Sequence, residues 1–169
     1  MERPFICGGA KYTISATNTI GLPVLLNNLP SEIIIQGNKL FLKPSFHVSL
    51  VCINEIIKKH KVIMPLFRDE VLKTFCDFVS NNPIDFLNYK NEFRYIEENN
   101  LKTVIVMCEI SNLSKLFEFI NSRYNLNIEY PPTHVTLYAH DGKTGIFLTD
   151  TNDIENLTKS ISNPLGFDL

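Results

Sequence analysis

The sequence His47-Val48-Ser49-Leu50 recurs later in the chain as His134-Val135-Thr136-Leu137. In each copy, polar and apolar residues alternate with a period of two, which predicts a short β-strand. The histidine and the hydroxyl residue then share one face of the strand, about 7 Å apart, and the apolar residues point to the other face, toward a core. Two imidazoles, each with a hydroxyl beside it, suit acid–base chemistry on a phosphate, provided that the two strands face one another.

Regular patterns continue on both sides of the two copies. Gly37-Asn38 and Asp141-Gly142 are typical of hairpin turns, whereas the segment with Gly21, Pro23 and Pro30 is expected to be a loop. Period-two alternation and apolar runs predict strands at 12–15, 32–36, 39–42, 45–52, 102–110, 134–140 and 145–149, with a weaker alternation at 92–96. Apolar residues at helical spacing predict helices at 66–80 and at 113–123, the latter capped by Ser111 or Asn112. A last short helix is expected from near Asn152, with Glu155 completing a capping box.

The two halves of the chain resemble each other coarsely. The two histidines are 87 positions apart, about half of the 169 residues, and each half has a helix, a hairpin and a histidine strand. An α+β fold of two similar lobes, each contributing one strand to a central cleft, accounts for this arrangement. We therefore expect a single domain, 1–169, with two pseudo-symmetric lobes of antiparallel sheet and outer helices around a central cleft.

The composition is that of an ordinary globular domain, with 44% hydrophobic and 20% charged residues. A net charge of −2 argues against an extended nucleic-acid footprint, although a nucleotide or an RNA end remains compatible. The cluster Lys58-Lys59-His60-Lys61 is expected to be a solvated loop or helix end, or else to touch phosphates at the rim of a site. Because no apolar run reaches the length of a signal peptide or a membrane span, we expect a cytoplasmic protein that does not enter a membrane.

The four cysteines are far apart and have no CxxC spacing. Cys52, Cys76 and Cys108 lie within apolar runs and are expected to be buried free thiols, whereas Cys7 is near the start of the chain. Free thiols are typical of a reducing compartment.

The paired motifs make the chain similar to the two-histidine (2H) phosphoesterases, which include the RNA-ligase-like cyclic phosphodiesterases. The signature of that family is two His-x-Thr/Ser motifs on strands of two pseudo-symmetric lobes, and the resemblance covers about 32–149. It implies that the motifs face each other across a cleft, that His47 and His134 are acid and base, and that Ser49 and Thr136 hold phosphate oxygens. Ser49 stands where threonine is common in the family, which keeps the hydroxyl. No residues match the subgroup patterns that would identify the substrate.

The residues themselves suit phosphodiester chemistry, independently of the family resemblance. Opening a 2′,3′-cyclic phosphate with water requires a base for the nucleophile and an acid for the departing ribose oxygen, and histidine can play either part near neutral pH. The sequence leaves open which of His47 and His134 is the acid. On a regular strand, Tyr138 and His140 continue the face of His134 and Thr136, so Tyr138 is a candidate to contact phosphate or stack on a base, or else to form a wall of the cleft.

The sequence lacks the motifs of other common catalytic and binding sites. No His/Cys/Asp/Glu group has zinc-ligand spacing, and neither GxSxG nor GxGxxG occurs. Gly142-Lys143-Thr144 lacks the earlier glycine of a P-loop.

We therefore expect a monomeric phosphodiesterase, without metal or cofactor, that hydrolyses 2′,3′-cyclic phosphates of RNA ends or nucleotides. The alternatives are a 2′–5′ phosphodiesterase, a hydrolase of cyclic-oligonucleotide signals, and a non-catalytic nucleotide-binding module that uses the same cleft.

Overall fold

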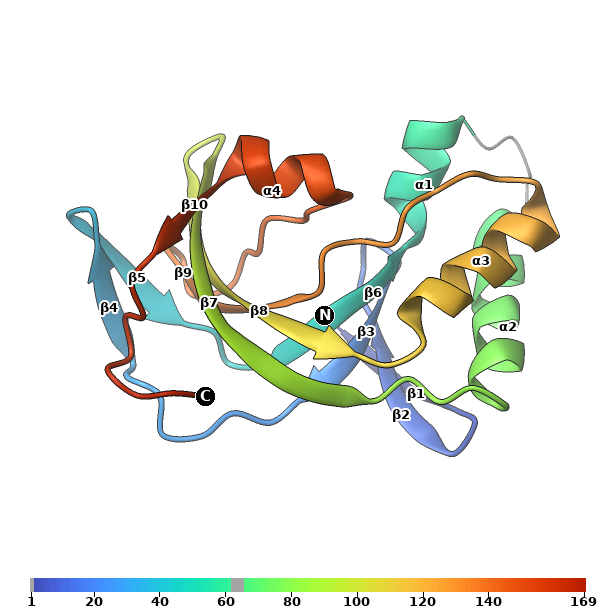
Figure 1. Ribbon diagram of the computed structural model, residues 1–169, viewed down its shortest axis with the longest axis horizontal. Coiled ribbons are helices and arrows are strands. Elements are labelled where there is room, and N and C mark those ends of the chain that lie inside the picture. The colour runs from blue at the N-terminus through green and yellow to red at the C-terminus, as the bar shows by residue number, and fades with distance from the viewer. Residues whose placement is uncertain (1, 62–65) are drawn as a thin grey trace.

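The computed structural model describes residues 2–61 and 66–169. These residues form an antiparallel β-sheet with four helices, which confirms the expected α+β class (Figure 1). The expected single domain also covers residue 1 and residues 62–65, which lie outside the described residues.

The strands are β1 (Arg3–Cys7), β2 (Ala10–Ile14), β3 (Thr19–Val24), β4 (Glu32–Ile35), β5 (Asn38–Leu42), β6 (Phe46–Cys52), β7 (Phe86–Glu98), β8 (Leu101–Ile110), β9 (His134–Ala139) and β10 (Thr158–Ile161). The helices are α1 (Ile53–His60), α2 (Phe67–Val79), α3 (Leu113–Tyr124) and α4 (Thr151–Leu157).

The two histidine strands, β6 and β9, are neighbours at the centre of the sheet. The strand order is β1-β2-β3-β6-β9-β8-β7-β10, and the β4–β5 hairpin joins β9 through Phe41 and Leu42. Val48 of β6 lies opposite Val135 of β9. The sheet is therefore continuous through the histidine strands, whereas the sequence predicted two lobes on either side of a cleft.

Apolar side chains cover both faces of this sheet. On the first face, Val48 and Val135 belong to a large core that also contains side chains of α1, α2, α3 and the β4–β5 hairpin. On the second face, Ile105 packs against Ile146, Leu148 and side chains of α4. Because side chains alternate along a strand, the histidine and hydroxyl of each motif lie on the second face.

Each histidine motif contains a β-bulge at its leucine. Ser49 and Val51 pair with consecutive residues of β3, so Leu50 has no partner there. In the same way, Thr136 and Tyr138 pair with consecutive residues of β8, which leaves Leu137 without a partner on that strand. An extra residue reverses the alternation beyond it, so both side chains after each hydroxyl turn toward the first core.

Residues 19–24, expected to be part of a loop, form strand β3 despite Pro23. β3 pairs with β2 at Gly21 and Ile20 but not at Pro23, which lies opposite His47 of β6 on the other side. A proline is tolerated there because its missing N–H leaves no ladder hydrogen bond unmade. Strands β1 and β10 and helix α1 were not predicted either.

The strand expected at 145–149 is absent, although Ile146 and Leu148 are buried. The segment 145–149 cannot pair with β9 as a hairpin, because β9 already pairs with β8 on one side and with β5 and β6 on the other. The next helix, α4, begins as expected, but its cap is Asp150, whose carboxylate accepts from the backbone N–H groups of Asn152 and Asp153.

The cysteines differ from the expectation at one position. Cys76 is not a free thiol but is bonded to Cys7, which ties β1 to α2 across 69 positions of sequence. Cys52 and Cys108 are free and buried, as predicted. The bonded pair removes part of the argument for a reducing compartment. Within residues 2–61 and 66–169, no helix has both the length and the apolar character needed to cross a membrane.

Candidate active site

Six side chains on the second face of the sheet surround one small pocket, here called the histidine pocket. They come from β6, β9 and the segment between β5 and β6. Its enclosed volume is about 20 Å³, close to what a single water requires, so a phosphate must occupy its mouth or displace a flexible side chain. The six residues are Lys43, Ser45, His47, Ser49, His134 and Thr136.

The pairing of β6 with β9 explains why both motifs line the same pocket. In an antiparallel pair, the register set by Val48 and Val135 places His47 opposite Thr136 and Ser49 opposite His134. His47 and His134 are then diagonal neighbours, about 7–8 Å apart at the backbone, which is within reach of two imidazole rings. The structure thus brings the two histidines and two hydroxyls predicted from the sequence into one square on one face.

His134 is held in one tautomer by the backbone that precedes it. Its Nδ1 lies 2.7 Å from the carbonyl oxygen of Pro132, which only accepts, so Nδ1 carries the proton and Nε2 carries the lone pair. The side chain is 5% exposed, and burial lowers the pKa of His134 to about 4, with a smaller contribution from nearby His47. His134 is therefore neutral at physiological pH, with a basic nitrogen available.

His47 lies between two opposite charges. Its Nδ1 is 3.0 Å from Oε1 of Glu2, which is an ion-pair distance, although the geometry is not that of a hydrogen bond. Burial lowers the pKa of His47, and the Lys43 cation lowers it further, whereas the Glu2 carboxylate acts to raise it. His47 thus has an anionic neighbour that stabilises its protonated form, which His134 lacks.

The ring of His47 packs closely on Gly21 of β3. A Cβ atom at Gly21 would lie 3.2 Å from Cδ2 of His47 and 3.0 Å from Oγ1 of Thr13. Because glycine has no Cβ, it leaves room for the imidazole beside the neighbouring strand, so Gly21 helps to orient His47.

Lys43 and Glu2 are residues of this site that sequence reasoning missed. The backbone N–H of Lys43 donates to the carbonyl of Leu137, which fixes the lysine beside β9. Burial lowers the pKa of Lys43, partly offset by the carboxylates of Glu2 and Asp141. Lys43 lies four residues before His47, which is a weak sequence signal, and no local pattern links Glu2 to either motif.

Tyr138 does not continue the face of His134 and Thr136. Its side chain is fully buried in the first core, and its hydroxyl donates to the carbonyl of Pro30 at 2.9 Å. The bulge at Leu137 reverses the alternation before Tyr138, so the tyrosine is a structural residue and does not line the histidine pocket. His140 is exposed beyond the end of β9.

No protein-family model matches this chain, and neither a curated protein nor a solved structure matches it. Among the described residues, no group of three His, Cys, Asp or Glu side chains is placed to hold a metal ion. The chemistry available to the site therefore follows from its own geometry. It offers a neutral imidazole, a second imidazole next to a carboxylate, two hydroxyls and an ammonium group, which together can bind an anion and transfer protons.

Proposed function

We propose that this protein is a phosphodiesterase that hydrolyses 2′,3′-cyclic phosphates of nucleotides or RNA ends by acid–base catalysis with two histidines. The observation that carries the proposal is that His47, Ser49, His134 and Thr136, from two motifs 87 positions apart, line one pocket with Lys43. The pocket is too small for an extended ligand, so the phosphate would bind at its mouth, between the two histidines. This arrangement also supports the resemblance to the 2H phosphoesterases.

His134 is the general base in this proposal. Its Nε2 has a lone pair because Nδ1 donates to Pro132, and burial keeps the ring neutral. Nε2 takes a proton from a water molecule as the water oxygen forms a bond to phosphorus. The negative charge of the bound phosphate raises the pKa of a neighbouring imidazole, which makes His134 a stronger base in the complex than in the free protein.

His47 is the general acid. Burial lowers the pKa of His47 in the free protein, whereas the Glu2 carboxylate and a bound phosphate act in the opposite direction and favour the imidazolium form. As the bond between phosphorus and one ribose oxygen breaks, His47 gives its proton to that oxygen, which leaves as a hydroxyl. The reaction consumes one water and yields a phosphomonoester. A proton then returns from His134 to His47 through solvent.

Ser49, Thr136 and Lys43 bind the phosphate. Hydroxyl donors and an ammonium group at the non-bridging oxygens stabilise the charge that grows there in the transition state. These contacts and the two histidines account for the reaction, so the mechanism requires no metal ion.

The test is hydrolysis of a substrate panel by the wild-type protein, by four variants of the histidine pocket and by one control variant. The panel contains nucleoside 2′,3′-cyclic phosphates, a 2′–5′-linked dinucleotide and a cyclic dinucleotide, which separates the proposed substrate from its enzymatic alternatives. We expect His47→Ala and His134→Ala to lower the rate at least about a hundredfold, and Ser49→Ala and Thr136→Ala to lower it less. The exposed His140→Ala is the matched control.

Near-normal turnover by either pocket-histidine variant, or strong inhibition by EDTA, would refute the mechanism. The pH–rate profile distinguishes the two roles. A base must be deprotonated and an acid protonated, so a bell-shaped profile is expected. His134→Asn should lose the acid limb of this profile and His47→Asn the alkaline limb. Tight nucleotide binding without any turnover would instead favour a binding module.

A further inference from the structure

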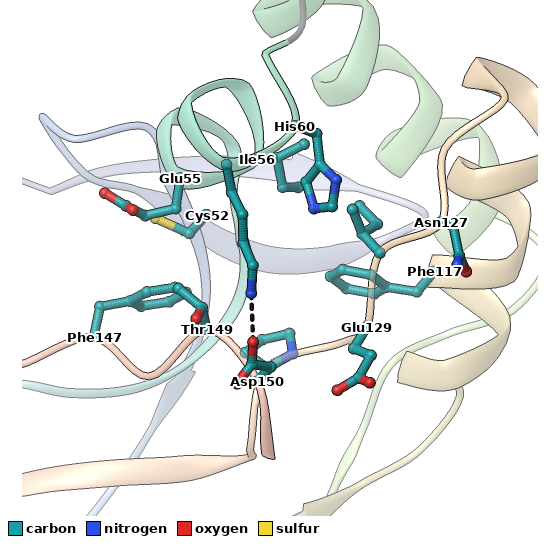
Figure 2. A pocket seen from close by; sticks show the side chains of 13 residues that line it. Cys52, Glu55, Ile56, His60, Phe117, Asn127, Glu129, Phe147, Thr149 and Asp150 are labelled. Carbon is teal, nitrogen blue, oxygen red and sulfur yellow. Dashed lines mark hydrogen bonds and ion pairs between the residues drawn. The ribbon is translucent and has the colours of Figure 1, made fainter. Parts of the chain in front are cut away.

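A larger cavity lies at the end of β6, and it is here called the side cavity (Figure 2). Its volume is about 170 Å³, compared with about 20 Å³ for the histidine pocket. A dry apolar cavity of about 150 Å³ accommodates a benzene ring, so the side cavity has room for one aromatic ring. Its apolar walls are Ile56, Phe117, Ile128, Pro131 and Phe147.

Strand β6 contributes side chains to both cavities. Ser49 lines the histidine pocket and Cys52 lines the side cavity. The bulge at Leu50 sends Leu50 and Val51 into the first core, and Cys52 is not part of that core. Cys52 therefore lies on the same face as Ser49, and three residues of strand separate them by about 10 Å.

Two further segments make the same connection. His134 lines the histidine pocket, and Pro131, three residues earlier, lines the side cavity. A Cβ atom at Gly145 would lie 3.4 Å from Oγ1 of Thr136, and Phe147, two residues later, lines the side cavity. Three separate segments of the chain, each within two or three residues, thus run from the proposed phosphate site to the side cavity.

The polar rim of the side cavity is acidic. Glu55, Glu129 and Asp150 line it, and the Lys59 ammonium is paired with Asp150, so the pair adds no net charge (Figure 2). The hydrogen bond that Lys59 donates to Asp150, together with their opposite charges, raises the pKa of Lys59 and lowers the pKa of Asp150, so both stay charged. A second phosphate would be repelled here. An uncharged ring with N–H donors at its edge fits the apolar walls and the carboxylate acceptors.

We propose that the side cavity binds the nucleobase of the nucleotide whose phosphate lies between His47 and His134. This proposal rests on the proposed function, because the histidine pocket supplies the phosphate site. Phe117 and Phe147 provide aromatic and apolar surface for the base, and the ribose spans the step between the two cavities. The ion pair of Lys59 with Asp150 joins α1 to the segment before α4, which are two walls of the side cavity.

The test compares cytidine 2′,3′-cyclic phosphate with the base-free 1-O-methylribose 2′,3′-cyclic phosphate. Contact of a base with an aromatic side chain strengthens binding by about tenfold, so the wild-type protein should favour the cytidine substrate in kcat/KM by at least that factor. Phe147→Ala should reduce this ratio about tenfold, mainly through KM. The control is Phe119→Ala, since Phe119 lies on α3 at 38% exposure and does not line the side cavity.

Equal kcat/KM for the two substrates, or an unchanged ratio in Phe147→Ala, would overturn this proposal while leaving the phosphodiesterase in place. If the wild-type protein hydrolyses neither substrate, the proposed function fails, and the side cavity is then tested by binding. Cytidine 3′-monophosphate should shift the backbone NMR signals of Asn127 and Phe147, and ribose 5-phosphate should not. Equal shifts with both ligands would exclude a nucleobase site.

Discussion

The buried, neutral state of His134 predicts a specific loss of stability in acid. The pKa of His134 is about 4 in the folded protein and about 6.5 in an unfolded chain. Between these values the unfolded state binds one more proton, so the free energy of unfolding falls as the pH is lowered. The difference of 2.5 pH units corresponds to about 3 kcal/mol, lost progressively from about pH 6.5 to about pH 4. This is a large part of the stability of an ordinary domain.

The perturbation is His134→Asn, which keeps a side-chain N–H near Nδ1 for the carbonyl of Pro132 but does not titrate. Urea unfolding would be followed at pH 7, 5 and 4 for the wild-type protein, His134→Asn and the exposed control His140→Asn. All other groups titrate in each protein, so the difference between wild type and His134→Asn isolates His134. We expect the wild type to lose about 2 kcal/mol more than His134→Asn by pH 5, and about 3 kcal/mol more by pH 4.

A parallel pH dependence in the wild type and His134→Asn would refute this reasoning. It would mean that the imidazole is solvated or already charged in the folded protein, and the assignment of His134 as a neutral base would fail with it. The His140→Asn control should keep the acid loss of the wild type, which excludes a general effect of removing a histidine.

Three more predictions test the surroundings of the site. Gly21→Ala should lower kcat/KM at least about tenfold, because the new Cβ displaces the ring of His47, and normal activity with an intact fold would contradict this. Lys43→Met should raise the pKa of His47 and Glu2→Gln should lower it, since the cation lowers and the carboxylate raises this pKa; NMR titration checks the sign of both shifts. Cys7→Ser, which removes the bond between β1 and α2, should lower the free energy of unfolding by about 4 kcal/mol under oxidising conditions. Equal urea midpoints for wild type and variant would count against that bond in solution.

The elements that the sequence predicted well have local signals. The β4–β5 hairpin follows from the turn at Gly37, and α2 and α3 follow from apolar spacing within a few turns of helix. β3 and the segment 145–149 have misleading local signals. Pro23 is typical of a strand break, but the pairing of β3 with β2 stops at Gly21, so Pro23 interrupts no ladder. The segment 145–149 has the alternation of a strand, but both edges of β9 are already paired.

For the site, the sequence by itself determined which side chains share a face within each motif, because alternation along a strand is a local property of the backbone. It therefore named His47 with Ser49 and His134 with Thr136. It could not predict that Tyr138 turns into the first core, since the bulge before it depends on pairing with the partner strand. Only the tertiary structure decided that β6 and β9 are neighbours and that Lys43 and Glu2 join them, because these contacts link residues far apart in the chain.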